Sequence, residues 1–166
     1  MKIALIIIAA LVVITLAYFI FLGFKSHSGK PAGLIKNQLA PCAKKPNCIC
    51  TEYPNDTSHY TDAIHYTDES VATVIQAVKT SIKKTGGVIT RLPDTGKQNH
   101  YIAANYTSTI FRYIDDFEVR IDNENQRIHI RSASRVGHSD MGANLKRIKR
   151  FKNELIQELK SITTND

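Results

Sequence analysis

Three arginines that could bind an anion, Arg131, Arg135 and Arg147, lie around the start of the last helix that the sequence pattern predicts. A helix N-terminus presents backbone N–H groups that have no partner inside the helix. Gly137 and Gly142 have no Cβ and allow the backbone to come close to a ligand. The sequence therefore predicts that the three guanidinium groups converge on one negatively charged group.

The same arginines allow a second interpretation, in which the chain itself supplies the negative charge. Asp115, Asp116 and Asp140 could neutralise the guanidinium groups in a buried brace, which would leave no site for a ligand. The sequence leaves both interpretations open. The candidate ligand-binding residues are the charged and polar side chains of this stretch: Arg131, Ser134, Arg135, Asp140, Asn144, Arg147, Asp115 and Asp116.

Carboxylates and histidines in this stretch could instead carry out acid–base chemistry. Asp115, Asp116 or Asp140 would act as the acid or base, assisted by His129 or His138, in a hydrolase-like enzyme. The sequence has no nucleophile elbow, phosphate-binding loop or metal-ligand helix. We therefore expect a binding or structural module in preference to an enzyme, with no catalytic residue, no cofactor and no metal.

Alternating residue types place the charged side chains on a hairpin. In residues 114–122 apolar side chains such as Phe117 alternate with charged ones such as Glu118, and residues 126–132 repeat the pattern. A period of two predicts a half-buried antiparallel hairpin, closed here by residues 122–125. The apolar face must pack on a layer of helices. The charged face is either a solvated surface with compensating pairs or the polar floor of a ligand site.

Apolar side chains recur every three to four positions in two further segments, which predicts two amphipathic helices. The predicted helices are one at 71–84, capped by residues 68–70, with acid in its first turn and Gly86-Gly87 as its stop, and one at 145–162 that begins after Ser139-Asp140. The predicted strands are 87–92, 100–107, 114–122 and 126–132, with a turn at 93–99. This order predicts an α+β fold: an antiparallel sheet of four to five strands with two helices packed on one face, in a helix-grip-like arrangement, preceded by one N-terminal transmembrane helix.

The N-terminal segment predicts a membrane anchor. Residues 3–24 contain no charged side chain, and only Thr15 is clearly polar. As a helix they would extend about 33 Å, enough to cross a hydrocarbon core of about 30 Å. A cleaved secretory signal, whose apolar run is shorter, is the alternative. We divide the chain into a transmembrane anchor or uncleaved signal at 1–24, a linker at 25–40 and a domain at 41–166.

Three cysteines lie in a short loop that also contains two prolines. A disulfide between Cys42 and Cys48 would close a seven-residue ring, stabilise the fold by about 2 kcal/mol and require an oxidising compartment. Free thiols are one alternative, and a zinc site with His59 or His65 as a distant ligand is another. Cys50 would be left over from the predicted disulfide.

Charge and targeting features predict the partners and the location. The chain has 22 Lys and Arg against 15 Asp and Glu, a net charge of +7, which suits an anionic lipid, phosphate or envelope polymer. It has no RNA-binding aromatic motif and no Cys/His finger, so we expect no nucleic acid partner. Lysines flanking the apolar segment favour a cytoplasmic domain. The cysteines favour an oxidising compartment, and we expect a membrane protein with one N-terminal span and an extracytoplasmic, periplasmic domain.

Three segments carry a resemblance to a known family. They are PC…PNC at 41–48, S…FRYIDD…E at 108–118 and RSASRVGHSDMGAN…RI at 131–148, and the last is highly specific. Over residues 39 to about 159 the chain resembles the domain-of-unknown-function family numbered 1499, found in bacteria and plant plastids. The resemblance implies a membrane-associated or exported domain, which supports the disulfide, and it implies no activity.

The chain departs from that family's pattern at three positions. Ala43 stands where proline is usual, which loosens the cysteine loop. Cys50 stands where serine is usual and adds a spare thiol. His138 stands where an aromatic residue is usual, so a family role for an aromatic ring at that position does not carry over to this chain.

Overall fold

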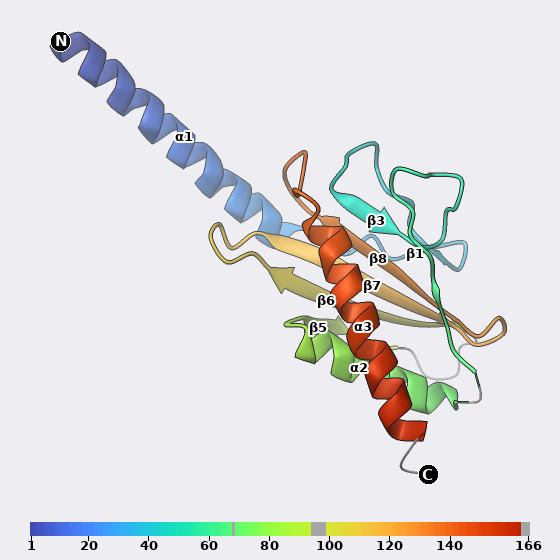
Figure 1. Ribbon diagram of the computed structural model, residues 1–166. Coiled ribbons are helices and arrows are strands. Elements are labelled where there is room, and N and C mark those ends of the chain that lie inside the picture. Colours follow the sequence, from blue (N-terminus) through green and yellow to red (C-terminus); the bar gives the residue numbers. More distant parts are fainter. Residues whose placement is uncertain (68, 94–98, 164–166) are drawn as a thin grey trace.

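The computed structural model describes residues 1–67, 69–93 and 99–163, and it consists of one long N-terminal helix followed by an α+β domain (Figure 1). The elements in chain order are α1 (Lys2–Ser28), β1 (Leu34–Ile35), β2 (Gln38–Leu39), β3 (Cys48–Cys50), β4 (Ile64–His65), α2 (Val71–Lys84), β5 (Val88–Arg91), β6 (Asn99–Thr107), β7 (Ile114–Asp122), β8 (Arg127–Ser134) and α3 (Ala143–Thr163).

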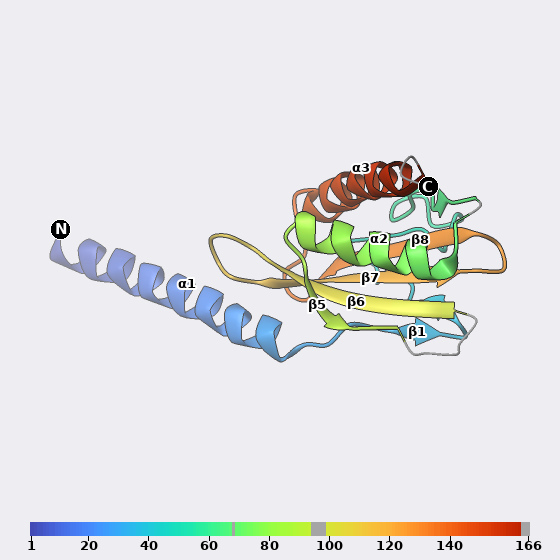
Figure 2. The ribbon, with the colours of Figure 1, turned by 90° about the horizontal axis from the view of Figure 1, so that it is seen from below.

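One antiparallel sheet forms the centre of the domain, in the strand order β3-β8-β7-β6-β5, with β4 paired to the other end of β8. Helices α2 and α3 lie side by side on one face of this sheet (Figure 2). The predicted α+β class, the antiparallel sheet and the two helices on one face are confirmed. The sheet has six strands because two short strands, β3 and β4, come from segments that were predicted as loops.

The core lies between the sheet and the two helices, and it is built from the apolar faces that the periodicities predict. The ring of Phe117 on β7 meets the ring of Phe151 on α3 edge to face, with centroids 4.9 Å apart. Buried aliphatic side chains from α2, α3 and the three long strands surround this pair. Burial of these faces is the main favourable contribution to folding.

Both domain helices begin at a side-chain cap. The hydroxyl of Ser70 accepts a hydrogen bond from the backbone N–H of Thr73 at the start of α2. The predicted acid in the first turn of α2 is absent because Glu69 precedes the cap. Asp68 and the turn residues 94–98 lie outside the described residues. At α3, Asp140 accepts from the N–H groups of Gly142 and Asn144, which confirms the predicted cap.

Helix α1 is long and apolar enough to cross a membrane, a property that a signal sequence would share. The chain that follows α1 packs on the face of the sheet opposite α2 and α3. The N–H of Gly33 donates to Glu118 on β7, and Leu39 is fully buried. The stretch predicted as a linker therefore covers part of this sheet face. It does so through a backbone hydrogen bond and a single apolar side chain, Leu39, and neither gives a periodic apolar pattern in the sequence. The division into anchor, linker and domain stays a prediction.

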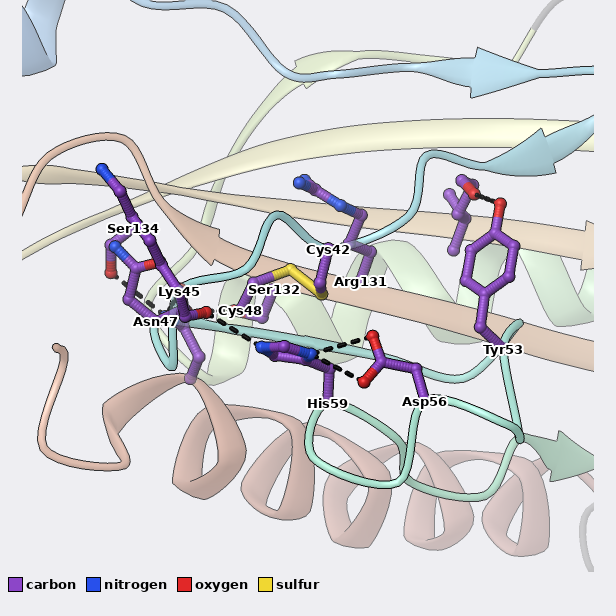
Figure 3. The surroundings of a disulfide bond; sticks show 12 residues. Cys42, Lys45, Asn47, Cys48, Tyr53, Asp56, His59, Arg131, Ser132 and Ser134 are labelled. Atoms are coloured by element: carbon purple, nitrogen blue, oxygen red, sulfur yellow. Dashed lines mark hydrogen bonds and ion pairs between the residues drawn. A yellow bond between two sulfur atoms is a disulfide. The ribbon is translucent and has the colours of Figure 1, made fainter. Parts of the chain in front are cut away.

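A disulfide joins Cys42 and Cys48, whose Cα atoms are 5.6 Å apart, as predicted (Figure 3). His59 connects this loop to the segment that follows, because its Nε2 donates to the carbonyl of Lys45 while its Nδ1 lies 2.8 Å from a carboxylate oxygen of Asp56. His59 is therefore engaged within the chain. Within residues 1–67, 69–93 and 99–163, no group of three or more His, Cys, Asp and Glu side chains could hold a metal ion.

The remaining cysteine, Cys50, is a buried thiol on β3. Burial raises its pKa from 9.0 to about 11. Because only the thiolate reacts with alkylating agents, we expect Cys50 in the native chain to react with iodoacetamide at least about 100-fold more slowly than an exposed cysteine. Mass spectrometry before and after denaturation measures this difference, and Cys50→Ser serves as the blank. Rapid labelling of the native chain would contradict the prediction.

Candidate functional site

The charged face of the β7–β8 hairpin is buried, although one expectation was a solvated surface. Asp116, Glu118 and Arg120 on β7 are all at most 5% exposed. The chain after α1 covers part of this face, and Glu52 from the segment after β3 contacts another part of it. A solvated face is therefore wrong, because two segments distant in sequence cover charges that the alternation placed away from the helices.

Glu118 is the acceptor at the centre of this covered face. Its Oε1 accepts from the N–H of Gly33 at 2.7 Å and from the hydroxyl of Tyr101 at 2.6 Å, and its Oε2 accepts from Arg131 Nη1 at 2.6 Å. Burial, together with the charge of Glu118, raises the pKa of the Tyr101 phenol. Arg131, the first predicted anion-binding residue, is thus paired with a carboxylate of the chain.

Arg135 lies on the same face of the sheet, directly after the end of β8 and four residues after Arg131. Its guanidinium group makes a two-pronged pair with Asp116, with distances of 3.0 Å from Nε and 2.7 Å from Nη2, and it donates to the carbonyl of Ser26 at 3.0 Å. Gly29 passes close to it, and a Cβ at that position would lie 2.7 Å from the Cδ atom of Arg135. Arg135 therefore joins the end of α1 to the sheet.

Arg147 lies on the opposite face, among the helices. Its Nη2 donates to Asp115 at 2.6 Å, and its Nη1 donates to Ser132 at 2.9 Å and to Asn144. Its guanidinium carbon stands 4.8 Å from the ring centre of Tyr106, in a cation–π contact. The predicted convergence of three arginines on one point is therefore wrong, since Arg131 and Arg135 lie on one face of the sheet and Arg147 on the other.

The other candidate residues join the elements around the start of α3. Asn144 is fully buried, and its amide donates to the carbonyl of Asn47 and to Ser134, while its carbonyl oxygen accepts from Ser132. Asp140 caps the helix. All eight candidate residues thus have partners within the chain, in the arrangement of a brace, and their role in binding a ligand stays a prediction.

The three carboxylates of the hydrolase-like alternative have other partners in the structure, and that alternative stays a prediction. Asp115 pairs with Arg147, Asp116 with Arg135, and Asp140 caps α3. Among the described residues, none of these three carboxylates has a histidine as a hydrogen-bond or ion-pair partner, since the ring of His129 faces a different segment.

A basic pocket of about 520 Å³ opens beside Arg147, between the end of α2 and the start of α3. Lys146 and Arg150, one turn apart on α3, line it and are exposed, and neither has a carboxylate within ion-pair distance in the described part of the chain. The pocket is lined by Thr85, Gly86, Tyr106, Thr107, Ala143, Lys146, Arg147 and Arg150. Asp115 offsets one of the three positive charges, so the pocket carries a surplus of two.

Two of the cations that line the pocket lie near the ring of Tyr106. Burial raises the pKa of the Tyr106 phenol, and Arg147 and Arg150 oppose that rise, which places both cations within electrostatic reach of the ring. The end of α2, the start of α3 and the β6–β7 loop lie at the end of the domain from which α1 projects (Figures 1 and 2). The pocket therefore lies at the end of the domain nearest α1.

The comparisons with known proteins give one match. A family described as "Protein of unknown function (DUF1499)" matches residues 38–155, more than half of the chain. The chain belongs to this family. The resemblance inferred from the three segments is thereby confirmed. No curated protein and no solved structure matches the chain. The matched range of this DUF1499 chain contains the disulfide, the brace and the basic pocket.

A second, polar pocket of this DUF1499 chain, of about 650 Å³, lies on the charged face. Glu52 pairs with Arg120 at 2.7 Å from its Oε1, and its Oε2 lies 3.7 Å from Nδ1 of His129. Thr51 lies 3.3 Å from the same nitrogen. Burial lowers the pKa of His129. Sequence reasoning missed Glu52 because it stands in an aperiodic loop, where nothing marks a carboxylate as buried.

Proposed function

We propose that this DUF1499 chain is a membrane-anchored module that binds an anionic, phosphate-bearing group in the basic pocket. The observation that carries the proposal is the pair Lys146 and Arg150, which line a concave site without a carboxylate partner in the described residues. Arg147, held by Asp115, gives the pocket a fixed third cation. Phosphate oxygens accept hydrogen bonds from both guanidinium and ammonium groups.

The anchor in this proposal is α1. The most apolar 18-residue window of α1 has a high mean hydropathy and contains no buried residue, whereas Ser26, near the end of the helix, is buried. We place the domain on the extracytoplasmic side, as an envelope protein, because the disulfide between Cys42 and Cys48 requires an oxidising compartment. Residues 1–24 act as the anchor, residues 25–40 connect it, and residues 41–166 form the domain.

The phosphate-bearing group could come from a lipid, from solution or from an envelope polymer. The position of the pocket at the α1 end of the domain favours a lipid headgroup. An anionic surface attracts each nearby Lys or Arg by about 1 kcal/mol.

The test removes the two unpaired cations from the full chain in neutral detergent micelles. Titration calorimetry follows the binding of two probes, short-chain dihexanoylphosphatidylglycerol and inorganic phosphate. We expect the double variant Lys146→Gln/Arg150→Gln to bind the phosphatidylglycerol about 30-fold more weakly, because two interactions of about 1 kcal/mol each are lost. Added salt should reduce the binding of the unchanged protein.

The matched control removes one Lys and one Arg at the other end of the domain, in the variant Lys36→Gln/Arg127→Gln. Both side chains are exposed, and the net charge changes equally. This control should bind as the unchanged protein does. Binding of both probes would indicate a general phosphate site, and binding of phosphatidylglycerol alone would indicate a lipid site. The proposal is wrong if neither probe binds, or if the two double variants lose affinity equally.

A further inference from the structure

The tip of the β6–β7 hairpin, residues 108–113, packs against α1 rather than against the domain core (Figure 1). The ring of Phe111 stacks on the ring of Phe19 with centroids 4.9 Å apart and planes 15° from parallel. Tyr113 stacks on Phe111 in turn, and its hydroxyl donates to the carbonyl of Phe19 at 3.2 Å. Aromatic contacts thus join the tip to the second half of the apolar helix.

Hydrogen bonds fix the same contact at the base of the hairpin. The N–H of Ile114 donates to the hydroxyl of Ser26 at 2.6 Å, and the Nε2 of His27 donates to the carbonyl of Arg112 at 3.0 Å. The N–H of Ser108 donates to the carbonyl of Tyr113, and the N–H of Tyr113 donates to the hydroxyl of Ser108. The depth of the tip relative to α1 is therefore set by several independent contacts.

The tip nevertheless exposes large apolar side chains. Ile110 is 82% exposed and Phe111 is 49% exposed. Between the tip and α1 runs a groove of about 620 Å³, apolar over most of its length, with His27 and Arg112 among its lining residues. An apolar groove with a basic rim has the chemistry that suits a lipid: acyl chain along the apolar part and phosphate at the rim.

The position of Phe19 gives the depth of the tip. Phe24, the last apolar residue before Lys25, is five positions after Phe19, and at 1.5 Å per residue this is about 7.5 Å along the helix. Side chains of interfacial helices reach about 5–10 Å into the boundary between headgroups and acyl chains. With α1 across the bilayer, the hairpin tip cannot remain in water, because Phe111 contacts Phe19 directly.

We propose that the β6–β7 tip is a second membrane-inserted element, in which Ile110 and Phe111 enter the bilayer beside α1 and a lipid acyl chain occupies the groove. The inference rests on the part of the proposed function that makes α1 an anchor, and it is independent of the basic pocket. Two attachments, one helix and one hairpin, fix the orientation of the domain on the membrane. The basic pocket, which begins at Thr107 next to this tip, then faces the headgroups.

The chain contains no tryptophan, so a single Trp substitution reports on one position. The full chain is reconstituted in neutral phosphatidylcholine vesicles, with or without lipid brominated at a shallow position of the acyl chain. Phe111→Trp is expected to fluoresce at a blue-shifted wavelength and to lose at least half of its intensity to the brominated lipid. Ile110→Trp repeats the test if Phe111→Trp does not fold.

Two further variants make the result decisive. Ile8→Trp, in the N-terminal third of α1 and within its apolar run, should be shielded from water and reports whether the helix is inserted. Ile156→Trp, a 42% exposed position on α3, should emit as in water and remain unquenched. The inference is overturned if Ile8→Trp shows insertion while Phe111→Trp emits as in water. It is also overturned if the emission of Phe111→Trp is blue-shifted but not quenched by the brominated lipid, because the ring would then be covered by protein and not by lipid. If Ile8→Trp shows no insertion, the anchor itself and the inference fail together. Neutral lipid keeps this outcome separate from a failure of the anion pocket.

Discussion

Glu118→Ala is expected to lower the free energy of unfolding by about 3–5 kcal/mol, because it removes the partner of a buried charge and leaves that charge in place. Glu118 is fully buried and accepts from Gly33, Tyr101 and Arg131. Each of these donors would lose its acceptor. A loss of this size is a large part of the 5–15 kcal/mol that stabilises an ordinary domain.

The measurement is urea unfolding of the full chain in detergent micelles, followed by near-ultraviolet circular dichroism of the tyrosines. Glu124→Ala is the matched control, since Glu124 is exposed in the turn between β7 and β8 and should change stability by less than about 0.5 kcal/mol. The double variant Glu118→Ala/Arg131→Met removes both charges and should recover part of the loss. A change below about 1 kcal/mol for Glu118→Ala would show that the covered face is open to water.

The regular elements could be predicted closely because periodicity depends only on local sequence. Predicted strand 114–122 coincides with β7, and predicted strand 126–132 lies within one to two residues of β8 at each end. Helix α2 ends at Lys84, in the predicted last turn and just before the glycines at 86 and 87 that were predicted to stop it. The apolar face of each element matches the core that it enters.

The covering of the charged face could not be predicted, because the segments that form it carry no pattern. Gly33 contributes a backbone N–H, and Glu52 contributes one carboxylate from an aperiodic loop. The separation of the arginines could be predicted in part, because Arg131 lies on β8 and Arg135 directly follows that strand, four residues later. Only the docking of α3 decides that Arg147 meets Asp115 on the other face.

The basic pocket shows the same limit. The sequence places Lys146 and Arg150 on one side of α3, in its N-terminal half, where cations oppose the helix dipole. It does not show that the end of α2 comes alongside and turns this side into a concavity. An unfavourable placement of charge on a helix was therefore the signal for the candidate site, and the packing of a second helix makes it a pocket.

Asn144→Ala is expected to lower the free energy of unfolding by about 3 kcal/mol, because Asn144 joins three parts of the domain through one amide. Its nitrogen donates to the carbonyl of Asn47 in the cysteine loop at 2.9 Å and to Ser134 on β8 at 3.1 Å. Its oxygen accepts from Ser132 at 2.6 Å and from Arg147. Alanine removes these four hydrogen bonds, each worth about 1 kcal/mol. The carbonyl of Asn47 still accepts from the N–H of Ser134, and Arg147 still donates to Ser132 and Asp115, so the expected loss is smaller than for four unpaired groups.

Asn153→Ala on the exposed side of the same helix is the control, and it should be neutral or slightly stabilising because alanine is the better helix former. Urea unfolding of both variants, as for Glu118→Ala, separates the loss of the amide bonds from the change in helix propensity. Asn144→Asp refines the test, because aspartate keeps the acceptor toward Ser132 and Arg147 and loses the donors toward Asn47 and Ser134. If the amide nitrogen holds the cysteine loop in place, Asn144→Asp should also destabilise the domain by more than about 1 kcal/mol. Equal stability of Asn144→Asp and the unchanged protein would contradict this role, and the disulfide and the bonds of Asn47 to Ser134 and Gly137 would then hold the loop without it.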